Sequence, residues 1–192
     1  MKNSRLFIFL TVIVYFLMYS SLWAMDMAEL MIGLSENKYK KSKFSESKNA
    51  FYLDKPILAE GTIEFRPPDT LIKKTIKPVQ VIQEITADSI RTIDENGEEA
   101  ILELSSQPAV AVLFQTIKGV LTGNKEVIEN NFSTTYKSEN SSWTLLLKPK
   151  EEYLTSWFKK IVIAGMGYKV SSIKIIEANN DTTIMKINEP GY

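Results

Sequence analysis

The chain has 192 residues, no cysteine and no histidine, and 23 basic residues that balance 23 acidic ones. It therefore lacks thiolate nucleophiles, the usual zinc ligands and the side chain that most often transfers protons near neutral pH. The zero net charge also argues against nucleic-acid binding. We expect one globular domain with no metal site, no cofactor and no catalytic residue.

Residues 1–24 have the pattern of an export signal. Lys2 and Arg5 precede an uncharged, mostly apolar run that ends at Ala24, before the first acidic residue. Cleavage after Ala24 would leave a single domain, residues 25–192. About twenty uncharged residues can also span a bilayer, so an uncleaved inner-membrane anchor is the alternative. In either case we expect the domain to lie in the periplasm.

The expected domain begins with signals for a short amphipathic helix. Asp26, followed three residues later by Glu29, forms a capping-box pattern, and apolar residues at helical spacing continue to Leu34. The helix is short and only modestly amphipathic. We therefore expect it to pack on the domain rather than to lie in a membrane surface.

From Tyr39 to about Leu104 the apolar residues recur mostly at every second position, which predicts β-strands. Turns rich in Pro, Asp, Asn and Gly separate the strands. Because strands joined by such short turns are antiparallel neighbours, the segment predicts a meander. The candidate strands are 41–52, 57–66, 70–76, 79–86, 88–94 and 98–104.

A helical segment interrupts the strands. Pro108 suits the first turn of a helix that the serine pair at 105–106 can cap, and Gly123 can end it. A second short helix is expected from Asn124. Residues 109–114 are all apolar, so we expect the first helix to have apolar surroundings on more than one side.

Five further candidate strands follow, and Trp143, Leu145 and Leu147 share one face of the second of them. Ten or eleven strands are too many for a flat sheet in a domain this small. The sheet should therefore curl, with the helices covering its open or concave side. These later strands are 132–138, 142–148, 158–164, 170–177 and 181–188.

A curled sheet with an apolar inner face and a small helical cover has two possible interiors. Side chains can fill the space as an ordinary core, or they can leave an apolar cavity of the kind that binds lipids. Alternation of apolar residues is expected in both cases, so the pattern does not distinguish them.

Several segments of the domain resemble the LolA-like family, whose best-known member is the periplasmic carrier of outer-membrane lipoproteins. The segments are FYLDKPILAEGTIEFRPPDTLIKKTIKP, PAVAVLFQTIKGVLTGN, FSTTYKSENSSWTLLLKPK and IVIAGMGYKVSSIKIIEANNDTTIMKI. Their shared features are a glycine-led strand that ends at prolines, a Trp before Leu-x-Leu-x-Pro, and an Asn-Asp-Thr hairpin. The resemblance implies an α+β fold that is mainly antiparallel β, an unclosed β-barrel with α-helices as a lid over an apolar cavity for acyl chains.

The resemblance implies a non-enzymatic periplasmic carrier that shields the acyl chains of a lipoprotein or lipid during transport towards the outer membrane. Such a carrier would be a monomer, with an inner-membrane donor and an outer-membrane acceptor as partners. One alternative is a carrier of a glycolipid or polyene lipid. Another is an envelope sensor or adaptor that binds a protein partner.

The cavity of such a carrier would be lined by inward-facing residues of the strands and by the apolar face of the lid helix. The residues expected to line it are Ile63, Phe65, Val81, Ile85, Trp143, Leu145 and Leu147 from the sheet, and Leu113, Ile117 and Leu121 from the lid.

In the family, an inward-facing arginine on the glycine-led strand latches the lid. If Gly61 matches the family's glycine, that position falls on Pro67, and Arg66 faces outward. Matching Arg66 with the arginine instead would turn Ile63 and Phe65 outward unless a bulge intervenes. A shift of one residue along the strand would expose all of its apolar side chains. The alternation of apolar and polar residues therefore favours an outward-facing Arg66.

Three charged or glycine-rich patterns have alternative interpretations. Glu60 and Glu64 could form a distant acid/base pair of an enzyme, but an exposed strand face favours simple solvation. The basic stretch from Lys38 to Lys48 could dock on a membrane surface, and a solvated edge strand is favoured. The Gly-Met-Gly sequence at 165–167 predicts a bend or bulge.

Overall fold

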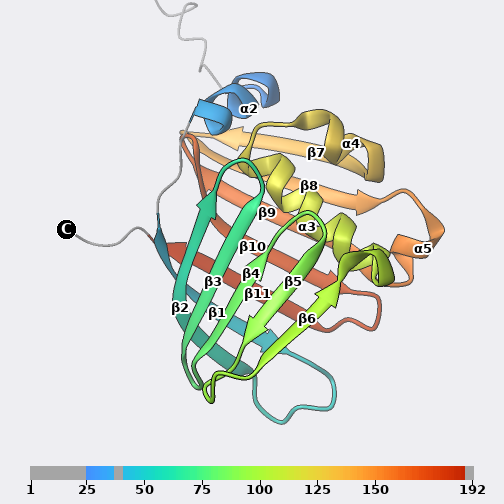
Figure 1. Ribbon diagram of the computed structural model, residues 1–192. Coiled ribbons are helices and arrows are strands. Elements are labelled where there is room, and N and C mark those ends of the chain that lie inside the picture. The colour runs from blue at the N-terminus through green and yellow to red at the C-terminus, as the bar shows by residue number, and fades with distance from the viewer. Residues whose placement is uncertain (1–24, 37–40, 189–192) are drawn as a thin grey trace, which may run out of the picture.

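The computed structural model describes residues 25–36 and 41–188 (Figure 1). The expected export signal, residues 1–24, lies outside the described residues. Among the helices of the described part, none is long and apolar enough to cross a membrane.

Eleven strands form one antiparallel sheet, which confirms the expected mainly antiparallel α+β fold. Their order is β6-β5-β4-β3-β2-β1-β11-β10-β9-β8-β7, so the first and last strands of the chain pair at its centre. The strands are β1 (Ser42–Asn49), β2 (Ile57–Arg66), β3 (Thr70–Lys77), β4 (Val81–Ile85), β5 (Ser89–Ile93), β6 (Glu99–Glu103), β7 (Phe132–Glu139), β8 (Ser142–Pro149), β9 (Phe158–Met166), β10 (Lys169–Glu177) and β11 (Thr182–Asn188).

The sheet curls without closing, and helices cover the opening. The edge strands β6 and β7 are consecutive in the chain, and the helical segment between them connects the two edges. In Figure 1, α3 runs between β5 and β6 in front and β8 and β9 behind. The helices are α2 (Met27–Glu36), the 3-10 turn η1 (Leu104–Ser106), α3 (Pro108–Leu121), α4 (Lys125–Asn131) and α5 (Glu152–Thr155).

Most helix boundaries follow the sequence signals. The backbone N–H of Glu29 donates to Asp26 Oδ1 at 2.8 Å, and Pro108 begins α3. Gly123 adopts a positive φ of 67° just after α3, which an L side chain would resist. The expected serine cap of α3 is wrong: Gln107 is the N-cap, because the preceding serines belong to η1, where Ser106 Oγ donates to the carbonyl of Glu103.

Lys43 and Lys48 of the basic stretch lie on a central strand, so the expectation of an edge strand is wrong, while Lys38 and Lys40 lie outside the described residues. β1 pairs with β2 on one side and with β11 on the other. Within the described residues Lys41 and Lys43 are exposed, and Lys48 Nζ lies 3.7 Å from a carboxylate oxygen of Glu177. Local alternation could not reveal this arrangement, because β11 lies at the far end of the chain.

Three clusters of buried apolar side chains make up most of the core, and α3 contributes to each of them. Val120 joins the largest cluster, which contains residues of α2, α4 and β7–β10. Phe114 packs against the cluster of Ile85, Ile90 and η1. Ala109 joins a third cluster with α5 and the start of β9. This arrangement explains why α3 is apolar on several sides.

Candidate functional site

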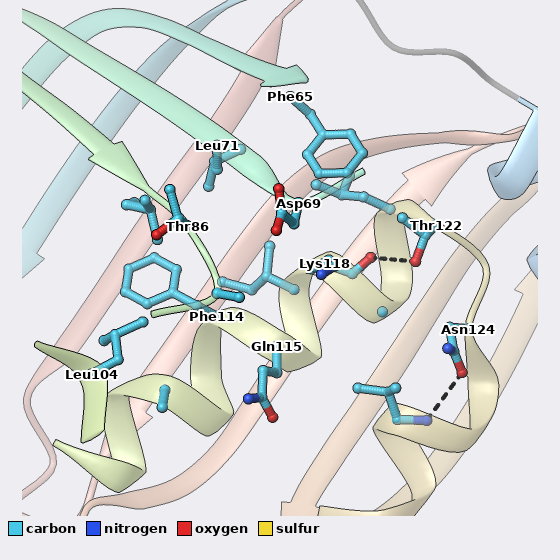
Figure 2. A pocket seen from close by; sticks show the side chains of 17 residues that line it. Phe65, Asp69, Leu71, Thr86, Leu104, Phe114, Gln115, Lys118, Thr122 and Asn124 are labelled. Atoms are coloured by element: carbon cyan, nitrogen blue, oxygen red, sulfur yellow. Dashed lines mark hydrogen bonds between the residues drawn. The ribbon is translucent and has the colours of Figure 1, made fainter. Parts of the chain in front are cut away.

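A pocket of about 240 Å³ lies between α3 and the ends of β2–β4 (Figure 2). Phe65, Leu71 and Ile85 line it from the sheet. Leu104 of η1 and Phe114 of α3 line the side opposite, so most of the wall is apolar.

The strand register explains why these sheet residues meet. Phe65 lies directly opposite Leu71, and Leu71 lies opposite Ile85. Directly opposed residues of antiparallel strands project from the same face of the sheet, so the three form one row on the concave face. We call Phe65, Leu71 and Ile85 the apolar row.

The helix presents residues to this row at helical spacing. Ala111, Phe114, Lys118 and Leu121 all line the pocket and are three or four positions apart, so they lie on one side of α3. Ile117 of the same helix also contributes. The face of α3 that covers the apolar row is therefore mostly apolar, and its polar lining residues are Gln115 and Lys118.

Polar residues lie where α3 ends and where β2 turns into β3. Thr122 Oγ1 donates to the carbonyl of Lys118 at 2.9 Å, and Asn124 Oδ1 accepts from the N–H of Val127 at 3.2 Å (Figure 2). These two bonds complete the helix ends. Asp69 of the β2–β3 turn also lines the pocket. The pocket thus combines an apolar wall with a polar margin.

Four of the expected lining residues border this pocket: Phe65, Ile85, Ile117 and Leu121. Ile63 lies two positions before Phe65 on the same face of β2 and is 8% exposed. Val81, at the start of β4, and Leu113 do not border the pocket. Leu113 instead packs between the largest core cluster and the α5 cluster.

The three expected residues of β8 lie in the packed core. Trp143, Leu145 and Leu147 are at most 2% exposed and belong to the cluster with α2 and α4. Trp143 Nε1 also donates to the carbonyl of Gly167 at 2.7 Å. Their shared inward face was correctly predicted, and this part of the interior is filled by side chains.

Sequence reasoning missed Leu71, Leu104 and Phe114 as pocket residues. Leu71 could have been found, because the turn after Arg66 places it opposite Phe65. Leu104 could not, since the expected strand continued through it, whereas the chain turns into η1 there. Phe114 lies in a run of six apolar residues, and the sequence does not show which of them face the sheet.

Arg66 lies on the convex face, as parity predicts. Its Nε donates to Glu64 Oε1 at 2.6 Å, and this hydrogen bond holds the pKa of Glu64 below its usual value. The β2–β3 register runs without a shift from Gly61 to Arg66, so no bulge reverses the faces within this stretch.

Replacing Arg66 with alanine should leave ligand affinity and the free energy of unfolding nearly unchanged. The side chain is 59% exposed and pairs only with Glu64 among the described residues. Titration of Arg66→Ala with an environment-sensitive apolar dye would measure the affinity, and urea unfolding would measure the free energy of unfolding. Tenfold weaker ligand binding by the variant would show instead that Arg66 controls the lid.

The carboxylates considered for acid/base chemistry are used in surface ion pairs. Glu64 pairs with Arg66, and Glu60 lies 3.7 Å from Lys77 with both side chains mostly exposed. The described residues contain no group of three or more metal-binding side chains. The Gly-Met-Gly sequence ends β9, and Gly167 forms the turn into β10 with a φ of 53°, as the bend prediction required.

The family model "Outer membrane lipoprotein carrier protein LolA-like" matches residues 20–185, which include every described strand in full or in part. The chain belongs to the LolA-like family. The resemblance in the sequence segments is thereby confirmed, as is the expected unclosed β-barrel with a helical lid. No curated protein matches this LolA-like chain.

Solved structures of distant sequence are also similar to the LolA-like chain. A LolA superfamily protein from Nitrosomonas europaea has 9% identity and a TM-score of 0.45, covering 86% of this chain and 93% of its own. A putative outer membrane lipoprotein-sorting protein domain from Vibrio parahaemolyticus has 9% identity and a TM-score of 0.42, covering 86% and 90%. The Pseudomonas aeruginosa MucA/MucB complex has 7% identity and a TM-score of 0.46, covering 86% and 59%. The family assignment rests on the family model alone.

Proposed function

We propose that this LolA-like protein is a non-enzymatic periplasmic carrier that shields acyl chains of a lipoprotein or lipid on their way to the outer membrane. The observation that carries the proposal is the apolar pocket beneath α3, with Phe65, Leu71 and Ile85 on one side and Phe114 on the other. In this proposal residues 25–192 form a single exported domain that works as a monomer.

Burial of methylene groups supplies the binding energy in this proposal. Each methylene removed from water contributes about 0.8 kcal/mol, so a few of them give a useful affinity. The pocket of about 240 Å³ is smaller than the usual range of about 300–1,000 Å³ for ligand sites. It therefore holds only part of an acyl chain in this conformation, and α3 must shift away from the apolar row to admit more.

The lid helix is suited to such a shift. Its residues Val110, Ala111 and Phe114 are only half-buried, although they pack on the cluster under β4 and β5. An acyl chain that entered between α3 and the apolar row would replace these contacts with equivalent apolar ones. On this side of α3 a ligand would thus offset the lost contacts, so the cost of opening would fall mainly on Ala109 and Val120, the buried residues by which α3 joins the other two clusters. An inner-membrane donor and an outer-membrane acceptor would control loading and release.

The test is to export the full chain in a bacterial host, purify the mature protein without detergent, and extract it with organic solvent. Mass spectrometry should find a lipid or acylated peptide that is absent from an unrelated exported protein treated in parallel. A glycolipid or polyene lipid in the extract would identify that carrier class instead. An empty extract, together with no binding of an environment-sensitive apolar dye, would overturn the proposal, and a stable complex with a membrane protein would then favour a sensor or adaptor.

A further inference from the structure

The concave face carries a stripe of polar side chains next to the apolar row. Lys73 lies opposite Gln83, and Gln83 lies opposite Thr92, so the three project from the same face of β3, β4 and β5. Lys73 comes two positions after Leu71 on β3, and Gln83 comes two positions before Ile85 on β4. We call Lys73, Gln83 and Thr92 the polar stripe.

The stripe includes a shielded ion pair. Lys73 Nζ donates to both carboxylate oxygens of Glu46, at 3.0 and 2.8 Å, and the two side chains are only 17% and 19% exposed. The same ammonium lies 5.1 Å from the centre of the Phe44 ring. The pair reaches diagonally across β2, from Lys73 opposite Ile63 to Glu46 opposite Ala59, and Gly61 between them has no side chain to obstruct it.

The stripe retains hydrogen-bonding capacity that the protein does not use. An ammonium has three donors, and Lys73 places two of them on Glu46. Within residues 25–36 and 41–188, the third donor, the Gln83 amide and the Thr92 hydroxyl have no hydrogen-bonding partner among side chains or backbone. All three residues are half-buried on the concave face. A polar group left without a partner beside an apolar surface is a favourable place for a polar ligand group.

The geometry points to a ligand with a neutral, oxygen-rich head group, and this inference rests on the proposed carrier function. We propose that the acyl tail lies against the apolar row while the head group receives hydrogen bonds from Lys73 and exchanges them with Gln83 and Thr92. Two strand positions separate the stripe from the apolar row by about 7 Å, the length of a glycerol or sugar unit. Because Glu46 balances the charge of Lys73, the stripe has no net charge with which to favour an anionic head.

Two kinds of head group share this chemistry. The ester carbonyls of a glycerolipid accept hydrogen bonds, and the hydroxyls of a sugar both donate and accept them. A panel of ligands with one common dodecyl chain separates them from charged heads. The panel contains dodecanoyl glycerol, dodecyl maltoside, dodecyl sulfate and dodecyltrimethylammonium, each used below its micelle concentration to displace an apolar dye.

Two variants remove the stripe in different ways. Lys73→Met with Glu46→Leu replaces the whole ion pair with apolar side chains of similar size, which proteins tolerate better than the loss of one partner. Gln83→Leu with Thr92→Val leaves the pair in place. The control is Lys77→Met with Glu60→Leu, which removes an ion pair of the same type from the exposed convex face. Thermal unfolding identifies any variant that does not fold. If the variant without the ion pair does not fold, the Gln83→Leu and Thr92→Val variant alone tests the inference.

Wild-type protein should bind the neutral ligands more tightly than the charged ones, and both stripe variants should weaken neutral-ligand binding about tenfold while the control does not. Tighter binding of dodecanoyl glycerol would indicate an ester-containing head group, and tighter binding of dodecyl maltoside would indicate a sugar. Equal affinities in folded stripe variants, or a preference for dodecyl sulfate, would overturn the inference. If wild-type protein did not bind the dye at all, the carrier function itself would fail, whereas dye binding without head-group discrimination would refute only the polar stripe.

Discussion

Replacing Phe114 with aspartate should reduce the affinity for an acyl ligand at least hundredfold. Phe114 lines the pocket opposite the apolar row, and an aspartate there would remove the apolar ring and place a charged group against an apolar ligand. Such a desolvated carboxylate costs several kcal/mol, and each loss of about 1.4 kcal/mol lowers affinity tenfold. Titration with an environment-sensitive dye, followed by displacement with a fatty acid, measures the change.

The matched control is Ile101→Asp. Ile101 is a large apolar residue of β6 that lies opposite Arg91 on the convex face and is 62% exposed. The same change of chemistry there should leave the dye affinity as it is in the wild type. If Phe114→Asp remained folded by circular dichroism and bound the dye normally, the ligand would have to lie away from α3.

Replacing Trp143 with alanine should lower the free energy of unfolding by about 3–5 kcal/mol, as large core truncations do. The indole is 2% exposed, packs in the largest cluster and donates to the carbonyl of Gly167. Trp143→Phe retains most of the apolar surface and loses mainly the hydrogen bond, so it should cost only about 1 kcal/mol. Urea unfolding of both variants checks these values.

The same variants distinguish a core residue from a ligand contact. Since Trp143 lies away from the pocket beneath α3, Trp143→Phe should bind the dye as the wild type does. A tenfold loss of affinity in Trp143→Phe with unchanged stability would mean that the ligand reaches the α2 side of the barrel. That outcome would mean that Trp143, Leu145 and Leu147 line the binding site, as expected from the sequence.

The regular parts of the fold could be predicted from the sequence because they depend on local signals. Alternation located every strand, and Pro108 and Gly123 marked the ends of α3. The face of Phe65 followed from the same alternation. Short segments such as α5 carry no comparable signal, since one helical turn contains too few residues to show a period.

The site was harder to predict, because it depends on which distant segments meet. Alternation showed that Trp143 faces inward, but not that α2 and α4 fill the space in front of it. An inward Lys73 was not expected either, because charged residues in a half-buried strand usually face solvent. Lys73 faces inward because it lies opposite the inward-facing Ile63 of β2. Its charge is accommodated there because it pairs with Glu46, which lies 27 residues earlier on another strand.

The pairing of β1 with β11 determines when the domain can finish folding. Strand β1 begins at Ser42, and its partner Thr182–Asn188 is the last strand of the described chain, so the centre of the sheet closes only after nearly all of the polypeptide is available. Closing so long a loop is entropically costly and slows folding. Until then the two meanders, β2–β6 and β7–β10, expose their inner faces, and a chaperone that binds extended apolar segments would protect the chain through this interval.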